Sequence, residues 1–333
     1  MRMLADASFH SGTMLAHALG VSRGTVSNAV HALQKTGLEI YAVKGRGYRL
    51  AQPISVLDAA AIARHAGAEA RHFRIDVRDV VDSTNTLLMQ RAATAESGVV
   101  LIAEWQQSGR GRMERPWQAV LGGSITLSLL WRFRQGAAAL AGLSLAVGVA
   151  LARVISAFGA AAVQLKWPND VLWCGRKLAG VLIEMHGDAL GPSTVVVGIG
   201  INVRLSEAAR ERIDQDATDL ETACQRPVDR NALAGALLAE LANVLRAFGN
   251  GGFAPLRAEW ERFNAHQGKR VTITRPGGRA QVGVVQGVAD DGALVMETAG
   301  ALTRVHSAEI SLRPIKRTRA EHRAGRALTR NRP

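Results

Sequence analysis

The sequence is poor in cysteine and in aromatic residues, and it has no long uninterrupted apolar run. Of its 333 residues, two are cysteine (Cys174 and Cys224) and 5% are aromatic. These cysteines form neither a disulfide framework nor a metal-binding spacing, which favours a reducing cytosol. No N-terminal segment has the apolar centre of a signal peptide. The most apolar stretch, residues 137–152, is shorter than the roughly 20 residues of a membrane span, so it predicts a buried helix.

Positive charge is concentrated at the two ends of the chain. The net charge is +13, and residues 1–52 contribute +4 from six basic and two acidic residues. Residues 313–333 hold eight basic residues and one acidic residue, a net of +7, which leaves +2 for the remainder. Basic ends predict a polyanionic partner, although a basic tail can also be plain solvated chain. A hydrophobic fraction of 47% excludes a disordered protein, and the length suggests two or three domains.

Residues 11–36 predict two short helices around a tight turn. Ser11 and Ser22 are candidate N-caps, and a glycine follows each helix. In the second helix, Val26, Val30 and Leu33 form one apolar face. This is the spacing of a helix-turn-helix, whose second helix can reach base edges in a major groove. The polar residues of that helix are Arg23, Thr25, Asn28 and His31.

A basic hairpin follows the two helices. Two β-rich runs in residues 38–50 flank the turn Lys44-Gly45-Arg46-Gly47. Such a hairpin after a helix-turn-helix is a wing, placed to contact phosphates. A small helical domain with solvated charge is the alternative. The helix pair, the basic wing and the local net charge together favour DNA binding.

Beyond the wing, the pattern predicts a mixed α/β region and then a small β domain. The predicted strands are residues 73–81, 98–105, 123–133, 162–173, 176–186 and 193–203. The predicted helices are residues 83–95, 137–158 and 229–266. Residues 267–313 alternate apolar and polar side chains between turns, which predicts a small antiparallel β-barrel. The expected fold class is therefore α+β and multidomain, with domains at 1–52, 53–266 and 267–313 and a basic tail at 314–333 that has too few apolar residues to fold alone.

The segment GRGRMER, residues 109–115, follows a buried strand and places three arginines beside two glycines. Backbone N–H groups of a glycine-rich loop can hold an anion, and arginines add charge-assisted hydrogen bonds. The segment is therefore a candidate cradle for phosphate or carboxylate. It is not a dinucleotide fingerprint, because Glu114 replaces the third glycine and no helix is predicted after it. A solvated basic loop remains the alternative.

Three further clusters carry candidate ligand-binding groups. In KWPNDVLWCGRKLAGVLIE, lysines can neutralise phosphates, Asn169 and Asp170 can bind Mg²⁺ or orient a nucleophile, and a glycine lets a ligand approach a strand. An ordinary strand–loop–strand is the alternative for this segment. VDSTN, residues 81–85, places hydroxyl and amide groups at a helix start. In GIGINV, Asn202 follows a glycine-rich strand.

No Ser-His-Asp or Cys-His pattern and no metal-ligand spacing stands out in the sequence. A bound divalent ion is therefore expected to arrive with a nucleotide. Clusters of arginine, lysine and glycine without an evident nucleophile suit a reaction driven by positioning and electrostatics. Adenylation of a carboxylate is such a reaction, because two anions must be brought together.

From about residue 9 to residue 313, the chain resembles the bacterial bifunctional biotin–protein ligase and biotin operon repressor family. The motifs DSTN, AEWQQSGRGR, KWPNDV, RKLAGVLIE and GIGINV occur in the family's order and spacing. The resemblance implies a winged helix-turn-helix, a ligase domain of the biotin/lipoate type and an SH3-like barrel. It also implies a cytoplasmic enzyme that makes biotinyl-5′-AMP from biotin and ATP and transfers biotin to a lysine of a carboxylase carrier domain. The loaded protein would dimerise on operator DNA and repress biotin synthesis genes.

The resemblance also assigns roles to single residues. Those that would hold biotin are Ser83, Thr84, Asn85, Gln106, Gly109, Arg110, Gly111, Arg112, Lys177 and Gly180. Those on the nucleotide side would be Lys166, Asn169, Asp170 and Asn202, with Mg²⁺ near Asp170. Lys177, Arg110 and Arg112 would be the catalytic group. DNA contacts would come from Arg23, Thr25, Asn28, Lys44 and Arg46.

The chain departs from the family pattern at several positions. The family usually has glycine where Glu114 stands and often arginine at Met113, so Glu114 would bring a negative charge near an anionic intermediate. Close relatives have a tryptophan after the GIGIN strand, whereas residues 203–259 contain none. Residues 1–7 leave little room for the helix that normally precedes the helix-turn-helix. Alternative functions are a biotin-responsive transcription factor without turnover, a lipoate ligase, and a ligase whose DNA-binding domain no longer regulates.

Overall fold

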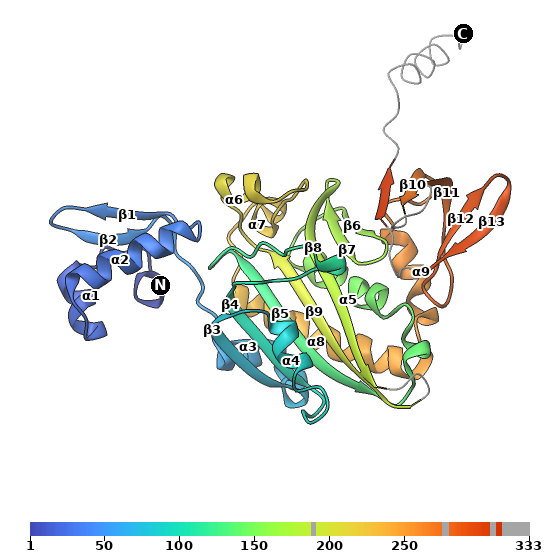
Figure 1. Cartoon of the computed structure of the whole chain (residues 1–333), viewed down its shortest axis with the longest axis horizontal. Coiled ribbons are helices and arrows are strands. Elements are labelled where there is room, and N and C mark those ends of the chain that lie inside the picture. Colours follow the sequence, from blue (N-terminus) through green and yellow to red (C-terminus); the bar gives the residue numbers. More distant parts are fainter. Residues whose placement is uncertain (188–190, 275–279, 307–310, 315–333) are drawn as a thin grey trace, which may run out of the picture.

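The computed structural model describes residues 1–187, 191–274, 280–306 and 311–314. In Figure 1 a helical module with a two-stranded hairpin lies at one end, a large sheet with its helices lies in the middle, and a smaller sheet lies at the other end. Of the basic tail predicted at 314–333, only Pro314 is described, and it pairs with Val271 in the smaller sheet. The α+β, multidomain class expected from the sequence is confirmed.

The N-terminal module begins and ends its helices where the capping residues predict. Ser11 Oγ accepts a hydrogen bond from Met14 N, and Ser22 Oγ accepts one from Thr25 N, each at 3.1 Å. The left-handed Gly20 (φ 65°) ends the first helix. In residues 1–7, which leave little room for a helix, a 3-10 turn buries Leu4 against the module's core. The elements are η1 Arg2–Leu4, α1 Gly12–Leu19, α2 Arg23–Lys35, β1 Ile40–Val43 and β2 Gly47–Leu50.

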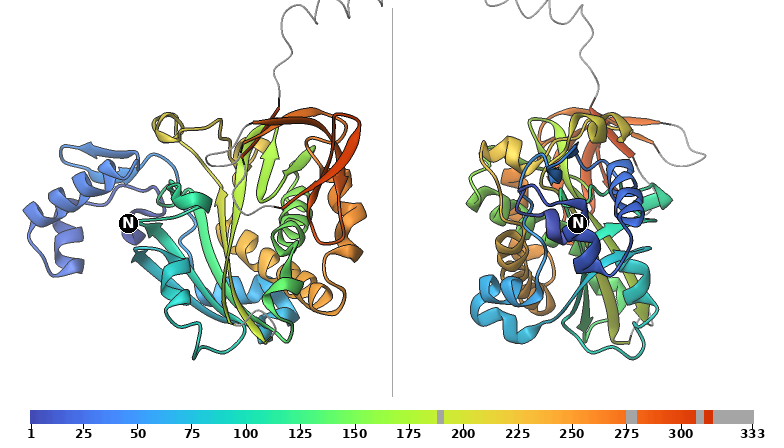
Figure 2. Two further views of the ribbon diagram at one scale, coloured as in Figure 1. Left: turned by 45° about the vertical axis from the view of Figure 1, so that its right-hand side comes forward. Right: turned by 90° about the vertical axis from the view of Figure 1, so that its left-hand side faces the viewer.

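The central sheet has the strand order β3-β4-β5-β9-β8-β7-β6. Its β3 and β4 are parallel, and each of the other neighbouring pairs is antiparallel. Figure 2 shows the strands side by side with the helical layer on one face. The strands are β3 Arg74–Val81, β4 Val99–Gln106, β5 Ser124–Phe133, β6 Val163–Lys166, β7 Asp170–Trp173, β8 Arg176–Gly187 and β9 Ser193–Asn202.

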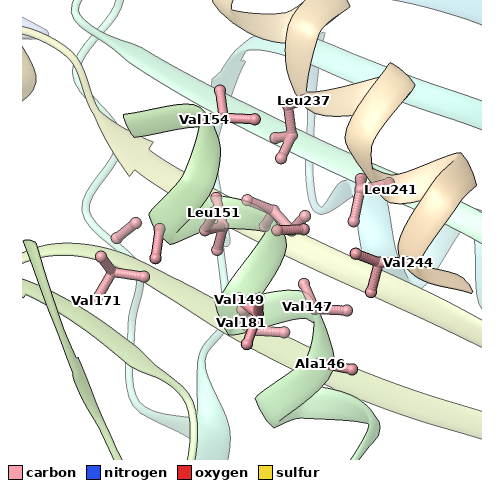
Figure 3. Close-up of a cluster of buried hydrophobic side chains, with 14 of the residues drawn as sticks. Ala146, Val147, Val149, Leu151, Val154, Val171, Val181, Leu237, Leu241 and Val244 are labelled. Atoms are coloured by element: carbon pink, nitrogen blue, oxygen red, sulfur yellow. The ribbon is translucent and has the colours of Figure 1, made fainter. Parts of the chain in front are cut away.

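Side chains on alternate positions of the central strands face opposite layers. On β9, Val195 and Val197 belong to the large core beneath the helices, whereas Val196 belongs to a smaller cluster on the other face. Figure 3 shows α5 and α8 packing valines and leucines into the large core. The helices on that side are α3 Ala59–Ala66, α5 Leu143–Ala157, α8 Arg230–Gly251 and α9 Ala254–Phe263, and on the other face lies α4 Thr84–Met89.

Among the described residues, the segments Ala137–Ala157 and Arg230–Gly251 are long and apolar enough to cross a membrane by length and composition. Both segments are mostly buried inside the protein, because they cover the central sheet and contact each other. The sequence-based prediction of a buried, small-residue helix after residue 137 is therefore confirmed. It begins with the 3-10 turn η4 Ala137–Leu140 and continues as α5.

Three predicted elements differ from the structure in their extent. The strand predicted at 162–173 is a hairpin of β6 and β7, because the turn at Trp167–Asn169 reverses the chain. The helix predicted at 83–95 ends as α4 at Met89 and continues in turns. The helix predicted at 229–266 is split into α8 and α9, since Gly252 has a φ of 64° and Pro255 lies at the start of α9. Remaining short elements are η2 Gly67–His72, η3 Arg112–Glu114, α6 Glu207–Arg212 and α7 Leu220–Cys224.

The C-terminal sheet is antiparallel, with the order β13-β12-β11-β10-β14. Its apolar residues, including Val271, Leu294 and Met296, are buried in the same large cluster as the central core. The indole of Trp167 donates to Gly292 O at 3.0 Å, which ties the β6–β7 turn to this domain. The strands are β10 Arg270–Thr274, β11 Gln281–Val288, β12 Leu294–Thr298, β13 Ala301–Val305 and β14 Ser311–Pro314.

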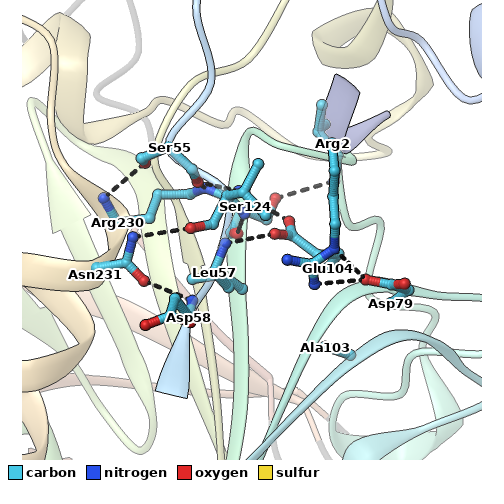
Figure 4. Close-up of polar contacts among 12 residues, drawn as sticks. Arg2, Ser55, Leu57, Asp58, Asp79, Ala103, Glu104, Ser124, Arg230 and Asn231 are labelled. Carbon is cyan, nitrogen blue, oxygen red and sulfur yellow. Dashed lines mark hydrogen bonds and ion pairs between the residues drawn. The ribbon is translucent and has the colours of Figure 1, made fainter. Parts of the chain in front are cut away.

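The linker between the N-terminal module and the central sheet is fastened by a buried polar cluster (Figure 4). Glu104 accepts a hydrogen bond from Leu57 N at 2.7 Å and forms an ion pair with Arg230 at 2.8 Å. Arg230 also donates to Ser55 O and, at 3.1 Å, to Ser124 O. At the module itself, Arg2 pairs with Asp79 on β3 at 2.8 Å. The linker is therefore held to both the sheet and α8.

Candidate functional site

One pocket lies among α4, the loop at residues 109–117 and the strands β8 and β9. Its floor is made of glycines on one face of the sheet. On β9 the odd-numbered positions point into the helical core, so Gly198 and Gly200 face the opposite side. Gly180 of β8 is paired with Gly200 across the strands. A Cβ at Gly198 would lie 2.3 Å from Asn85 Oδ1, and a Cβ at Gly200 would lie 2.3 Å from Trp117 Cε2. Glycine at these positions therefore opens space for the side chains above the sheet.

A network of uncharged polar groups lies at one end of this pocket. The Thr84 N–H donates to Gln106 Oε1 at 2.8 Å, and the Thr84 hydroxyl lies 2.7 Å from Ser128 Oγ. Ser128 Oγ lies 2.6 Å from Asn85 Oδ1. Ser83 caps α4, where its hydroxyl accepts from Thr86 N at 3.4 Å. Because these groups are buried, they suit an uncharged polar ligand with several hydrogen-bonding atoms.

The glycine–arginine loop is folded as a hairpin over the pocket. Trp117 N donates to Gly109 O at 2.8 Å, and Gly111 N donates to Arg115 O at 2.7 Å. Arg110 and Pro116 form an antiparallel bridge between these bonds. The Trp117 side chain is thereby placed against the glycine floor, with its ring centroid 5.7 Å from Lys177 Nζ.

The tip of the loop contains two consecutive non-glycine residues in the left-handed region. Met113 has a φ of 56° and Glu114 a φ of 53°. This conformation costs about 1–2 kcal/mol for a residue with a Cβ, whereas glycine adopts it without that cost. Glu114 is largely exposed, and both its carboxylate oxygens lie 3.3 Å from Arg110 Nη1. Its charge is thus paired with the loop's own arginine.

The opposite end of the pocket is cationic. Lys177 Nζ lies 2.7 Å from Asp170 Oδ1, and both side chains are more than four-fifths buried. The backbone of Lys177 is fixed on both sides, because its N–H donates to Asp216 O and its carbonyl accepts from Thr218 N. Arg112 Nη1 donates to Asn169 Oδ1 at 3.4 Å. Burial lowers the pKa of the Arg112 guanidinium, while nearby Asp170 opposes that shift.

The segment at residues 265–269, which leads into the C-terminal sheet, reaches the same end of the site. Ala265 N donates to Leu165 O at 2.8 Å, beside Lys166. His266 is buried, and its pKa is lowered to about 4 by burial first and then by Lys166 and Lys269. The imidazole is therefore neutral at pH 7 and adds no charge to this region. Its Nδ1 has no hydrogen-bond partner among the described residues.

Most residues predicted from the sequence line this one pocket. They are Ser83, Thr84, Asn85, Gln106, Arg110, Gly111, Arg112, Lys166, Asn169, Asp170, Lys177 and Gly180. Gly109 and Asn202 do not line it. Gly109 packs closely against Gln106, since a Cβ at residue 109 would lie 2.9 Å from Gln106 Nε2. Asn202 is buried and donates to Thr218 O at 3.1 Å, so it fixes the segment that holds Lys177.

Sequence reasoning missed several residues of the site. Trp117, Gly198 and Gly200 line the pocket, and Ser128 and Glu184 hold groups that do. The two glycines carried a usable signal, because they alternate with β-branched residues on one strand. Trp117 lies directly after the arginine-rich segment, but nothing in the sequence spacing showed that this segment folds back over the sheet. Trp117 Nε1 is buried without a hydrogen-bond partner among the residues that the structure describes.

The N-terminal module presents a polar helix face and a basic wing. Val26 and Val30 are buried, while Arg23, Thr25 and Asn28 on the other faces of α2 are exposed. Lys44 and Arg46 are exposed at the hairpin tip. The Arg46 guanidinium carbon lies 4.2 Å from the Phe9 ring centroid. The geometry matches the predicted helix-turn-helix with a wing.

The described residues contain no group of three or more His, Cys, Asp or Glu that could hold a metal ion. Asp170, the acidic residue predicted to lie near Mg²⁺, is already paired with Lys177. A divalent ion in this pocket would therefore need most of its ligands from a bound nucleotide and water.

Three family models match the chain. Residues 1–49 match an HTH domain, residues 77–202 match the biotin/lipoate A/B protein ligase family, and residues 266–313 match the biotin protein ligase C-terminal domain. Each match falls on a part that the structure shows as a separate arrangement of helices and strands.

The chain is also similar to named relatives along most of its length. It is 36% identical over 311 residues to the bifunctional ligase/repressor BirA of Salmonella typhimurium, covering 93% of this chain and 95% of the relative. It is 36% identical to the biotin–[acetyl-CoA-carboxylase] ligase of Mycobacterium tuberculosis, covering 73% and 91%. The solved biotin protein ligase of Aquifex aeolicus in complex with biotin and ATP superposes with a TM-score of 0.62 at 27% identity, covering 73% and 99%.

Proposed function

Because the chain belongs to the BirA family of bifunctional ligase/repressors, we propose that it is an ATP-dependent biotin–protein ligase and a transcriptional repressor. The observation that carries the ligase proposal is the polarity of the pocket. Uncharged hydrogen-bonding groups around Asn85 lie at one end, and the largely buried Lys177 and the half-buried Arg112 lie at the other. This is the arrangement needed to hold a neutral ring system while its carboxylate meets a phosphate.

In the first step, an oxygen of the biotin carboxylate attacks the α-phosphorus of ATP. A carbon–oxygen–phosphorus anhydride forms, and pyrophosphate leaves with the electrons of the broken P–O bond. Both reactants are anions, so their approach needs fixed cations in a water-poor site. We assign that role to Lys177, supported by Arg112, with Ser83, Thr84, Asn85 and Gln106 orienting the biotin rings. We assign Lys166 and Asn169, which line the pocket, to the nucleotide side, and Mg²⁺ would enter with ATP near Asp170.

In the second step, a lysine amine of a carboxylase carrier domain attacks the acyl carbon of the anhydride. An amide forms and AMP leaves. The hairpin at residues 109–117 covers the pocket, so we propose that it shields the anhydride from water until the carrier arrives. We propose a cytoplasmic location, because the reaction consumes ATP and the two cysteines suit a reducing compartment. We further propose 1–52, 53–266 and 267–313 as the domain boundaries.

A turnover assay tests the ligase proposal against its alternatives. We expect pyrophosphate release with biotin and ATP, and mass spectrometry should show an added biotinyl group on a carrier domain. Lipoate with ATP should release little pyrophosphate. Biotin binding without pyrophosphate release would favour a transcription factor without turnover, and preference for lipoate would favour a lipoate ligase.

Arg112→Gly is expected to accelerate dissociation of biotinyl-5′-AMP by about tenfold, the value of one charge-assisted hydrogen bond, while affecting free biotin less. Arg112 is half-buried at the cationic end, so it would contact the phosphate group of the adenylate that the first step forms. Stopped-flow dissociation of the adenylate measures this rate. Arg91→Ala, an exposed arginine beyond α4, is the matched control. Equal rates in Arg112→Gly and the wild type would contradict the assignment.

Biotin together with ATP is expected to promote dimerisation and tighter binding to a palindromic operator. One winged module makes few contacts, so useful affinity needs a symmetric pair on two half-sites.

Arg46→Ala should weaken binding similarly on all sequences and reduce the slope of log affinity against log salt by about 1, whereas Asn28→Ala should change sequence preference. Gel-shift titrations upstream of biotin synthesis genes test this, with exposed Arg304→Ala as control. Equal affinity with and without biotin and ATP would refute the regulatory half of the proposal.

A further inference from the structure

Glu184 of β8 lies directly behind the polar end of the pocket and is not one of the residues that line it. Its Oε2 accepts a hydrogen bond from Asn85 Nδ2 at 2.7 Å. Its Oε1 lies 3.4 Å from Arg110 Nη2, which also donates to Thr86 Oγ1 at 2.9 Å. One carboxylate therefore contacts both a pocket residue on α4 and the first arginine of the loop.

The carboxylate fixes which way the Asn85 amide faces. An ionised carboxylate can only accept hydrogen bonds, so the amide nitrogen of Asn85 must face Glu184. The amide oxygen then faces Ser128, whose single hydroxyl proton is donated to it across 2.6 Å. Ser128 Oγ also lies 2.7 Å from Thr84 Oγ1, and the Thr84 hydroxyl donates to Gln106 Oε1 at 3.0 Å. The charge on Glu184 thus sets the orientation of the Asn85 amide and, through it, the direction of the bond from Ser128.

Without that acceptor the network has no fixed direction. Asn85 is 4% exposed, so water cannot readily satisfy its amide. A side chain at residue 184 that cannot accept would leave the buried Nδ2 unpaired and let the amide turn over. The amide oxygen would then leave Ser128, and the hydroxyl donors facing the pocket would be rearranged.

We propose that Glu184 is a positioning residue for biotin recognition, acting through the orientation of Asn85, with Arg110 as a secondary partner. This inference rests on the proposed function, since it names biotin as the ligand of the network. The bond to Asn85 is the shorter of the two and involves a buried partner, so the Asn85 arm carries the effect. Glu184 does not line the pocket, so its proposed effect on the ligand passes through the residues that it holds.

The test measures biotin affinity by calorimetry in full-length protein, together with KM and kcat for each substrate. Glu184→Leu, which keeps a similar volume but cannot accept, should raise Kd and KM for biotin about tenfold and leave KM for ATP unchanged. Glu184→Gln should restore affinity to within about threefold of the wild type, because its amide oxygen can still accept from Asn85. His186→Gln, exposed two residues further along β8, is the control.

A double-mutant cycle separates positioning from a general structural role. In an Asn85→Ala background, Glu184→Leu should have less than about a twofold further effect, because the partner through which it acts is gone. Additive losses, an unchanged affinity in Glu184→Leu, or a rise in the KM for ATP as large as that for biotin would overturn the proposal. If Glu184→Leu fails to fold, Glu184→Ala replaces it in the same cycle. A wild-type protein that binds no biotin would instead refute the proposed function itself.

Discussion

Lys177→Ala is expected to slow formation of biotinyl-5′-AMP by about 10²–10³-fold, the usual effect of removing one fixed donor at a developing charge. The Lys177 side chain is 17% exposed, and the Lys177 backbone is held by Asp216 and Thr218, so no other group can take its position without rearrangement. The carboxylate and the α-phosphate would then meet without this cation. Single-turnover pyrophosphate release measures the rate.

The Lys177 experiment needs a stability control, because Asp170 loses its ion-pair partner in the same variant. The melting temperature of Lys177→Ala is therefore compared with that of the wild type, and rates are measured well below both. Lys35→Ala removes an exposed lysine at the end of α2 and should leave adenylation unchanged. A folded Lys177→Ala protein that retains more than about a tenth of the wild-type rate would contradict the assigned role.

Glu104→Gln is expected to destabilise the central domain by about 3–5 kcal/mol, because it leaves the Arg230 charge buried without its partner. Both side chains of this pair are 1% exposed, and burial is the main cause that lowers the pKa of Arg230, while Glu104 opposes it. The substitution keeps the shape of the side chain, so the loss comes from the missing charge. Thermal unfolding should show a melting temperature roughly 10 °C lower.

Asp76→Asn is the matched control for the buried pair. It breaks an arginine–aspartate contact of 2.8 Å with Arg78 in which both side chains are at least one-third exposed. Exposed pairs of this kind contribute about 0–1 kcal/mol. A melting temperature of Glu104→Gln that falls no further than that of Asp76→Asn would show that the linker cluster does not depend on the ion pair.

The sequence by itself determined the local elements and the general nature of the site. Ser11 and Ser22 cap the helices that their neighbours predict, because capping depends on side chains within three residues of the cap. The run of β-branched residues in 193–203 predicted β9 correctly, because such a run fits a strand that is buried on both faces. Lysine, arginine and glycine in family motifs predicted an anion-binding pocket, and the same motifs led to the correct family.

Only the tertiary structure decided how those groups meet. Asn85 and Glu184 are 99 positions apart, and no local pattern links a helix start to the ninth residue of a distant strand. The Trp117 side chain contacts the glycine floor because the loop folds back as a hairpin, which depends on backbone bonds between Gly109 and Trp117. Strand pairing sets which side chains face each other, and a single chain's periodicity gives the face of each residue but not its neighbour across the sheet.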